Sequence, residues 1–84
     1  MATEVKLPQW AMLLNDGEVV EWKVNVGDKV QKGDILCSAE EAKVAEDIAS
    51  PVDGTVLKLC VEEGENIPVL TTICIIGDDG ESVD

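Results

Sequence analysis

One lysine is placed where its amine could do chemistry, in the stretch Glu40-Glu41-Ala42-Lys43-Val44. Lys43 sits in the connection between two halves of the chain that resemble each other. Loops held by a rigid scaffold are where functional residues concentrate in folded domains. We therefore take Lys43 as the candidate functional residue, with Glu40, Glu41, Ala42 and Val44 as the neighbours through which a partner would recognise it.

The remaining residue types exclude several other chemistries. The chain has 84 residues and contains no histidine and no arginine, which excludes imidazole general bases, arginine clamps on phosphate and histidine-based metal sites. Its three cysteines, Cys37, Cys60 and Cys74, form no CxxC motif. We expect each to be a small buried hydrophobe in a reducing compartment, not a disulfide partner. The sequence offers no catalytic residue and no metal site.

A strong negative charge limits the possible partners. The formal net charge is −12, from 18 acidic and 6 basic residues. Nucleic acid and anionic membranes would repel such a chain, whereas a basic protein face would attract it; the charge could also serve solubility alone. No apolar run is long enough to cross a membrane, and no signal peptide opens the chain. We expect an intracellular protein.

The chain contains an internal repeat with a shift of 37 residues, which lays Asp16–Cys37 over Asp53–Cys74. Identical residues coincide along it: Asp16-Gly17 with Asp53-Gly54, Val19 with Val56, Val24 with Val61, Gly27 with Gly64, and Cys37 with Cys74. Each half of such a repeat buries its apolar face against the other half. The same shift would place Lys6 opposite Lys43.

Short alternating apolar runs separated by turn signals predict an all-β fold. The expected strands are 3–7, 19–26, 35–39, 44–48, 55–61 and 71–76, with shorter ones at 29–32 and 66–69. We interpret Gly17, Gly27, Gly33, Gly54 and Gly64 as turn residues, and Trp22 as a core residue. The repeat predicts two sheets related by an approximate two-fold axis. Residues 1–76 form the domain, and 77–84 an acidic tail or linker start.

An ordered set of motifs gives the chain a family resemblance. The motifs are Leu7-Pro8-Gln9, Val26-Gly27-Asp28-Lys29-Val30, Lys32-Gly33-Asp34 and Ser50-Pro51-Val52-Asp53-Gly54-Thr55-Val56. With Gly33 ten residues before Lys43 and Gly54 eleven after it, the chain resembles the lipoyl domains of 2-oxo acid dehydrogenase acyltransferases (E2 components). It resembles more distantly the biotinyl carrier domains.

The resemblance implies a fold and a function. The fold would be a flattened barrel of two four-stranded antiparallel sheets with Lys43 at the tip of a tight turn. Lipoic acid joined to Lys43 as an amide would act as a swinging arm, carrying acyl groups and reducing equivalents between the active sites of a 2-oxo acid dehydrogenase complex. The domain would catalyse nothing itself.

The resemblance also implies partners and a location. The partners would be a lipoate ligase or lipoyl transferase, the 2-oxo acid dehydrogenase (E1) and dihydrolipoamide dehydrogenase (E3). The domain itself would be monomeric. It would work in a bacterial or archaeal cytoplasm, or in the mitochondrial matrix.

Two departures from the family pattern keep alternatives open. Lipoyl domains usually place Asp before the modified lysine, where this chain has Ala42, and biotinyl domains place Met on both sides, where it has Ala42 and Val44. A biotinyl carrier domain of a carboxylase or decarboxylase is one alternative. An unmodified interaction module, in which Ala42 marks loss of recognition by the ligase, is the other.

Overall fold

The computed structural model describes residues 2–8, 15–41, 44–78 and 80, and over these residues it contains strands and no helix. The strands are β1 (Thr3–Lys6), β2 (Asp16–Trp22), β3 (Lys29–Val30), β4 (Ile35–Glu41), β5 (Val44–Ala49), β6 (Gly54–Leu59), β7 (Asn66–Pro68) and β8 (Thr72–Gly77).

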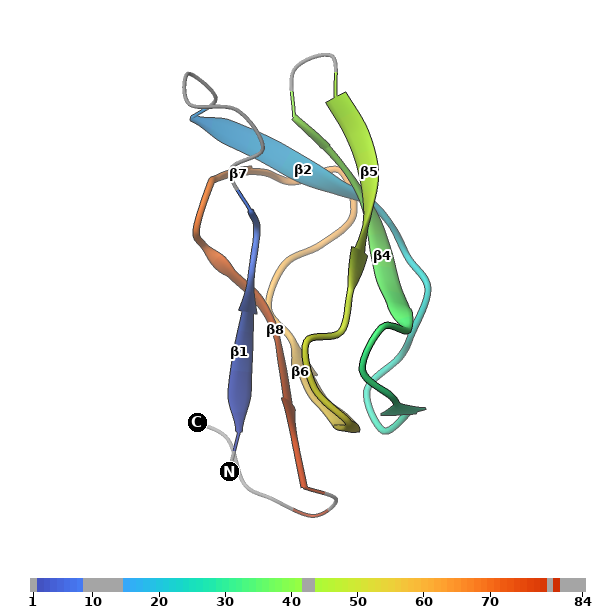
Figure 1. Ribbon diagram of the computed structural model, residues 1–84. Coiled ribbons are helices and arrows are strands. Elements are labelled where there is room, and N and C mark those ends of the chain that lie inside the picture. The colour runs from blue at the N-terminus through green and yellow to red at the C-terminus, as the bar shows by residue number, and fades with distance from the viewer. Residues whose placement is uncertain (1, 9–14, 42–43, 79, 81–84) are drawn as a thin grey trace.

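The strands form two four-stranded antiparallel sheets, with the orders β1-β8-β6-β3 and β5-β4-β2-β7. Figure 1 shows the two sheets as the two sides of an elongated barrel. The predicted fold class is therefore confirmed. The outer strands β1, β3 and β7 have four residues or fewer, which limits the length of unpaired edge there, whereas the outer strand β5 has six residues.

The two sheets repeat one another in register as well as in strand order. Val19 pairs with Ala39 in one sheet and Val56 with Ile76 in the other, and the ladder shifts register immediately after Val19 and after Val56. Two reciprocal hydrogen bonds join the halves: the Gly27 N–H donates to the Val56 carbonyl, and the Gly64 N–H donates to the Val19 carbonyl, both at 2.8 Å. The 37-residue shift is thus a true two-fold relation across the barrel.

The first strand departs from that shift. Ser38 and Ile75 are equivalent under the 37-residue shift. Asp47 pairs with Ser38 and Glu4 pairs with Ile75, so β1 corresponds to β5 with an offset of 43 residues. The offset is larger because the connection from β1 to β2 is longer than the connection from β5 to β6. The predicted equivalence of Lys6 with Lys43 is therefore wrong.

The core lies between the sheets and is made almost wholly of aliphatic residues. Its buried hydrophobic members are Val5, Leu7, Val19, Val30, Leu36, Cys37, Ala39, Ile48, Val56, Val61, Ile67, Ile73, Cys74 and Ile76. Trp22 packs against this core while only partly buried, and its Nε1–H donates to the Val61 carbonyl at 3.1 Å. Trp22 therefore closes the edge of the core and does not fill its centre. Trp10 lies outside the described residues.

The first long strand ends earlier than its sequence pattern predicts. The apolar alternation runs to Val26, but β2 ends at Trp22. The Asp28 carboxylate accepts a hydrogen bond from the Asn25 N–H at 2.8 Å, and the Asp28 N–H donates to the Asn25 carbonyl at 3.0 Å. This aspartate-closed turn satisfies the backbone locally, so the chain leaves the sheet.

The cysteines divide into two buried thiols and one exposed thiol. Burial raises the pKa of Cys37 to about 12, with the Asp47 charge as a second cause. Burial also raises the pKa of Cys74 to about 12, with Cys37 and Cys60 as lesser causes. Cys60 is exposed, so its predicted burial is wrong. Successive side chains continue to alternate between the two faces beyond the end of β6. Val61 faces the core, so Cys60 faces outward.

Candidate functional site

The candidate lysine belongs to the connection between β4 and β5, which are neighbours in their sheet. Their ladder extends from Ile35 opposite Ala49 to Glu41 opposite Val44. The sequence between the last pair is Ala42-Lys43, which lies outside the described residues. Because only two residues separate strands that remain in register, the hairpin connection has the shortest common length. Figure 1 places this hairpin at the end of the barrel opposite the start of β1 and the end of β8.

Glu41 forms the base of the hairpin and is completely buried, at 0% exposure. Its side chain lies over Gly17 of β2, where an added β-carbon would be 2.5 Å from Glu41 Cγ and 2.8 Å from the Glu40 carbonyl oxygen. Gly17 was predicted to serve a turn, but it lies inside a strand. The absence of a side chain at Gly17 is what allows the end of β4 and the Glu41 side chain to pack here.

An acidic surface surrounds the hairpin. Glu40, Glu46 and Asp47 are exposed, and Val44 is 37% exposed beside them. A shallow depression of about 280 Å³ on this face is lined by Val20, Ser38, Ala39, Glu40, Ala45, Glu46 and Asp47. Glu46 lies on the exposed edge strand β5. Glu41 is buried and so contributes no surface for a partner to contact in this conformation.

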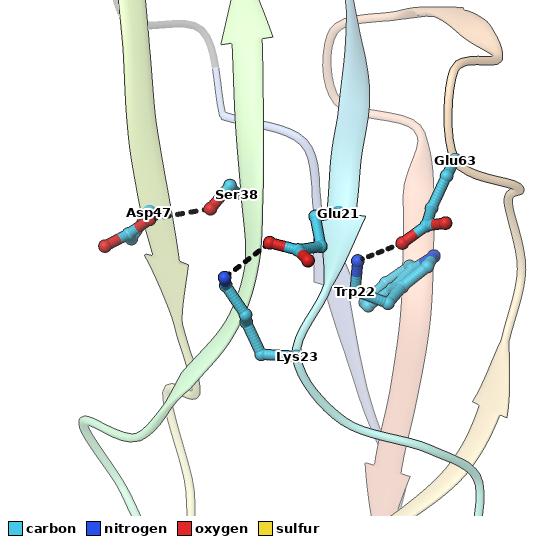
Figure 2. Close-up of polar contacts among 6 residues, drawn as sticks. All are labelled: Glu21, Trp22, Lys23, Ser38, Asp47 and Glu63. Atoms are coloured by element: carbon cyan, nitrogen blue, oxygen red, sulfur yellow. Dashed lines mark hydrogen bonds and ion pairs between the residues drawn. The ribbon is translucent and has the colours of Figure 1, made fainter.

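Figure 2 shows polar contacts on the hairpin strands β4 and β5 and around the end of the neighbouring strand β2. The Ser38 hydroxyl on β4 donates to Asp47 Oδ1 on β5 at 3.0 Å, across one cross-strand pair of the ladder. Lys23 Nζ lies 2.5 Å from Glu21 Oε1, and this hydrogen bond raises the pKa of Lys23. Exposed pairs of this kind contribute little to stability. The Ser38–Asp47 bond is also exposed, but unlike the Lys23–Glu21 pair it directly joins the two strands of the hairpin.

The rest of the described surface offers a groove and no metal cluster. A depression of about 380 Å³ lies between the edge strands β1 and β5, lined by Glu4, Val5, Lys6, Pro8, Asp47, Ile48, Ala49 and Pro51. Among the described residues, no three His, Cys, Asp or Glu side chains gather as metal ligands would. That part of the chain also has no helix long and apolar enough to cross a membrane.

Two symmetric sheets and a lysine-bearing hairpin of minimal connection define the class of barrel-sandwich carrier domains. The model of the Biotin_lipoyl family, described as "Biotin-requiring enzyme", matches residues 3–76, and the chain belongs to this family. The family resemblance found in the sequence is thereby confirmed.

Two similar curated relatives come from bacteria and are much longer than this chain. It is 42% identical over 83 residues to the dihydrolipoyllysine-residue acetyltransferase component of the acetoin cleaving system of Bacillus subtilis, covering 99% of this chain and 21% of the relative. It is 42% identical over 71 residues to the corresponding component of the pyruvate dehydrogenase complex of Acholeplasma laidlawii, covering 84% of this chain and 13% of the relative. The chain thus spans about a fifth or less of these relatives.

A solved structure agrees with the fold. The lipoyl domain of the 2-oxoglutarate dehydrogenase complex from Azotobacter vinelandii superimposes with a TM-score of 0.75 at 20% identity. The superposition covers 89% of this chain and 95% of that domain.

Proposed function

We propose that this chain is a lipoyl carrier domain in which Lys43 is joined to lipoic acid as an amide. The domain moves acyl groups and reducing equivalents between the active sites of a 2-oxo acid dehydrogenase complex. The observation that carries the proposal is the register of Glu41 opposite Val44, which leaves Ala42-Lys43 as the whole connection of the hairpin. The names of the bacterial relatives support lipoate as the attached group.

The residues below Lys43 act as a rigid stalk. The Ser38–Asp47 hydrogen bond aligns the two strands, and the packing of Glu41 on Gly17 anchors the end of β4 to β2. A tether on a firm base makes each visit to a partner's active site an intramolecular encounter at high effective concentration. When attached, the lipoyl group supplies the dithiol–disulfide couple for acyl and electron transfer.

Charge at the hairpin changes on attachment. Amide formation removes the positive charge of Lys43, which leaves the exposed carboxylates of Glu40, Glu46 and Asp47 less compensated. A negative surface around the arm favours enzymes whose active-site entrances are basic. We therefore infer recognition through Glu40, Val44 and the acidic face of β5.

The proposal assigns catalysis to other chains. A lipoate ligase or lipoyl transferase would attach the arm, E1 would load it and dihydrolipoamide dehydrogenase would reoxidise it. The bacterial relatives favour a cytoplasmic setting. Residues 1–76 would form the carrier unit, and 77–84 an acidic tail or the start of a linker. Gly77 itself is the last residue of β8 and pairs with Thr55, so the tail or linker would begin after it.

Biotin is the second candidate for the attached group, because the family description names biotin-requiring enzymes. Biotin attachment would make the chain a carrier of carboxyl groups. The absence of Met on either side of Lys43 disfavours it.

Co-expression with a lipoate ligase, and separately with a biotin ligase, tests both candidates. Intact mass and peptide mapping should show one lipoyl increment on Lys43 and none in a Lys43→Arg variant. A biotinyl increment on Lys43 would replace lipoate by biotin. No increment with either ligase would leave an unmodified interaction module. Efficient lipoylation that Ala42→Asp does not improve would show that Asp is unnecessary before this lysine.

A further inference from the structure

Leu70 has a backbone conformation that its side chain disfavours. Its φ is 68°, and among the described residues it is the only residue other than glycine with a positive φ. In this left-handed region the β-carbon of an L-residue crowds the following carbonyl oxygen. Glycine avoids the crowding, and the two-fold counterpart of Leu70 is indeed Gly33, with φ 97°.

The backbone of this turn is required by the fold, whereas the leucine side chain is not. The Leu70 N–H donates to the Leu7 carbonyl at 2.7 Å, and the Gly33 N–H donates to the Ser50 carbonyl at 2.8 Å in the other half. The fold therefore needs a left-handed residue at both positions. Leu70 remains 61% exposed, so burial within the chain does not offset the crowding.

The Leu70 turn lies at the same end of the barrel as the lysine hairpin. In the sheet order β5-β4-β2-β7, Glu40 at the end of β4 pairs with Glu18, and Glu18 pairs with Asn66 on β7. Two strand spacings, about 10 Å, therefore separate the hairpin base from β7. Leu70 follows directly in the connection from β7 to β8, which Figure 1 places on the hairpin side of the molecule.

An acidic depression lies between the hairpin and the Leu70 turn. It has a volume of about 260 Å³ and is lined by Asp16, Gly17, Glu18, Glu40 and Asn66. Pro68 pairs with Asp16 at its border and is exposed, and Val69 beside it is half-buried. This end of the barrel thus presents the exposed apolar side chain of Leu70 close to the carboxylates that line the depression.

We propose that the Leu70 turn is the apolar anchor of a docking surface for the enzyme that loads the arm. The inference rests on the proposed carrier function. The partner presents an apolar socket for Leu70, with lysine or arginine side chains facing Asp16, Glu18 and Glu40. Single exposed apolar residues are common on proteins. Leu70 differs because its two-fold counterpart is glycine and leucine is strained in this conformation, and such strain persists mainly at functional sites.

The loading step is where a selective contact matters. The loading enzyme determines which acyl group the arm receives. Reoxidation of the arm is the same reaction whichever acyl group was carried. A side-chain anchor beside the arm therefore serves the loading enzyme.

The test uses one variant in which stability and docking change in opposite directions. Leu70→Gly should raise Tm by a few °C, because relief of the crowding outweighs the larger entropy of glycine in the unfolded chain. The same change should weaken binding of the unlipoylated domain to E1 about tenfold, and lower kcat/KM for reductive acylation of the lipoylated domain equally. The E1 probes are those of the Bacillus subtilis acetoin system and the Acholeplasma laidlawii pyruvate dehydrogenase complex, and calorimetry gives the Kd.

Two control variants separate docking from strain, and a third variant tests the contribution of charge to docking. Val26 is also 61% exposed but lies in the β2–β3 connection, so Val26→Ala should leave Kd unchanged. Gly33→Leu should lower Tm without changing Kd. Asp16→Asn should weaken binding at low salt and have no effect at high salt, because exposed charges are screened.

The outcomes distinguish the two proposals. If the unaltered domain is not lipoylated, or neither E1 acylates it, the proposed carrier function fails and this inference fails with it. If the unaltered domain is acylated but Leu70→Gly binds E1 equally well, the docking inference alone is overturned. A loss confined to dihydrolipoamide dehydrogenase would also overturn it.

Discussion

The carboxylate side chain of Glu41 is fully buried over Gly17, in the space that a β-carbon on Gly17 would fill. The same close approach recurs in the other half, where a β-carbon on Gly54 would lie 2.9 Å from the Gly77 carbonyl oxygen. Gly17 is the second residue of β2 and Gly54 is the first residue of β6, and each lies next to the end of the neighbouring strand. Glycine is therefore required by packing at these positions, because neither residue has a positive φ.

Gly17→Ala should destabilise the domain and disturb the hairpin together. The new methyl group would force Glu41 or the end of β4 to move, and overpacking of this kind costs about 1–3 kcal/mol. Urea unfolding would measure the loss, and the initial rate of Lys43 lipoylation should fall as well.

Gly54→Ala is the matched control. It should cost a similar free energy of unfolding, but it acts at the end of the barrel away from the hairpin. Lipoylation of the folded Gly54→Ala protein should proceed at the unaltered rate. Equal slowing in both variants would show that Gly17 affects attachment only through global stability.

Native alkylation should label Cys60 alone. Cys60 is exposed, whereas Cys37 and Cys74 are buried with pKa values raised to about 12. The thiolate is the reactive form, so the two buried thiols are protected both by burial and by protonation. Iodoacetamide at pH 8 should add one carbamidomethyl group, and peptide mapping should place it on Cys60. Urea should expose all three thiols, and native labelling of Cys37 or Cys74 would contradict the structure.

Stability should fall at alkaline pH. The pKa values of Cys37 and Cys74 rise from 9.0 to about 12 on folding, so between these values the folded chain retains protons that the unfolded chain releases. Because the unfolded state then binds fewer protons, the free energy of unfolding decreases as pH rises. Each thiol contributes a slope of about 1.4 kcal/mol per pH unit over that window.

Urea unfolding at a series of pH values from 8 to 11 measures this slope. The Cys37→Ala and Cys74→Ala variants should each show a shallower alkaline decline, even though their cavities lower stability at every pH. An unchanged slope in the double variant would assign the decline to other groups.

Trp22→Phe should cost about 1 kcal/mol through the loss of one hydrogen bond, in addition to any loss of packing. The Nε1–H of Trp22 donates to the Val61 carbonyl at 3.1 Å in a partly buried setting, so the variant leaves that carbonyl without its indole donor. Glu63→Ala is the comparison, because Glu63 accepts the Trp22 backbone N–H at an exposed position where water can replace it. Its effect on the urea midpoint should be smaller. A larger effect for Glu63→Ala would reverse this ranking.

The repeat and the alternation of apolar residues determined the fold class and its symmetry. The register confirms the equivalence of Cys37 with Cys74 and of Val19 with Val56. These features are visible in the sequence because strand pairing and burial follow a period of two. The placement of Lys43 between two strands was also visible, from the apolar runs on either side.

Other features depended on contacts between residues far apart in the chain. The sequence pattern treats Gly17 and Gly33 alike as turn residues, but only packing against Glu41 distinguishes the first, and only a positive φ distinguishes the second. The burial of Glu41 and the exposure of Cys60 oppose their residue types, because the direction of a side chain depends on which face of its strand meets the second sheet. The repeat lays Leu70 over Gly33, but the leucine residue type itself gives no indication of a left-handed backbone. That conformation follows from its hydrogen bond to Leu7, which only the tertiary structure brings beside it.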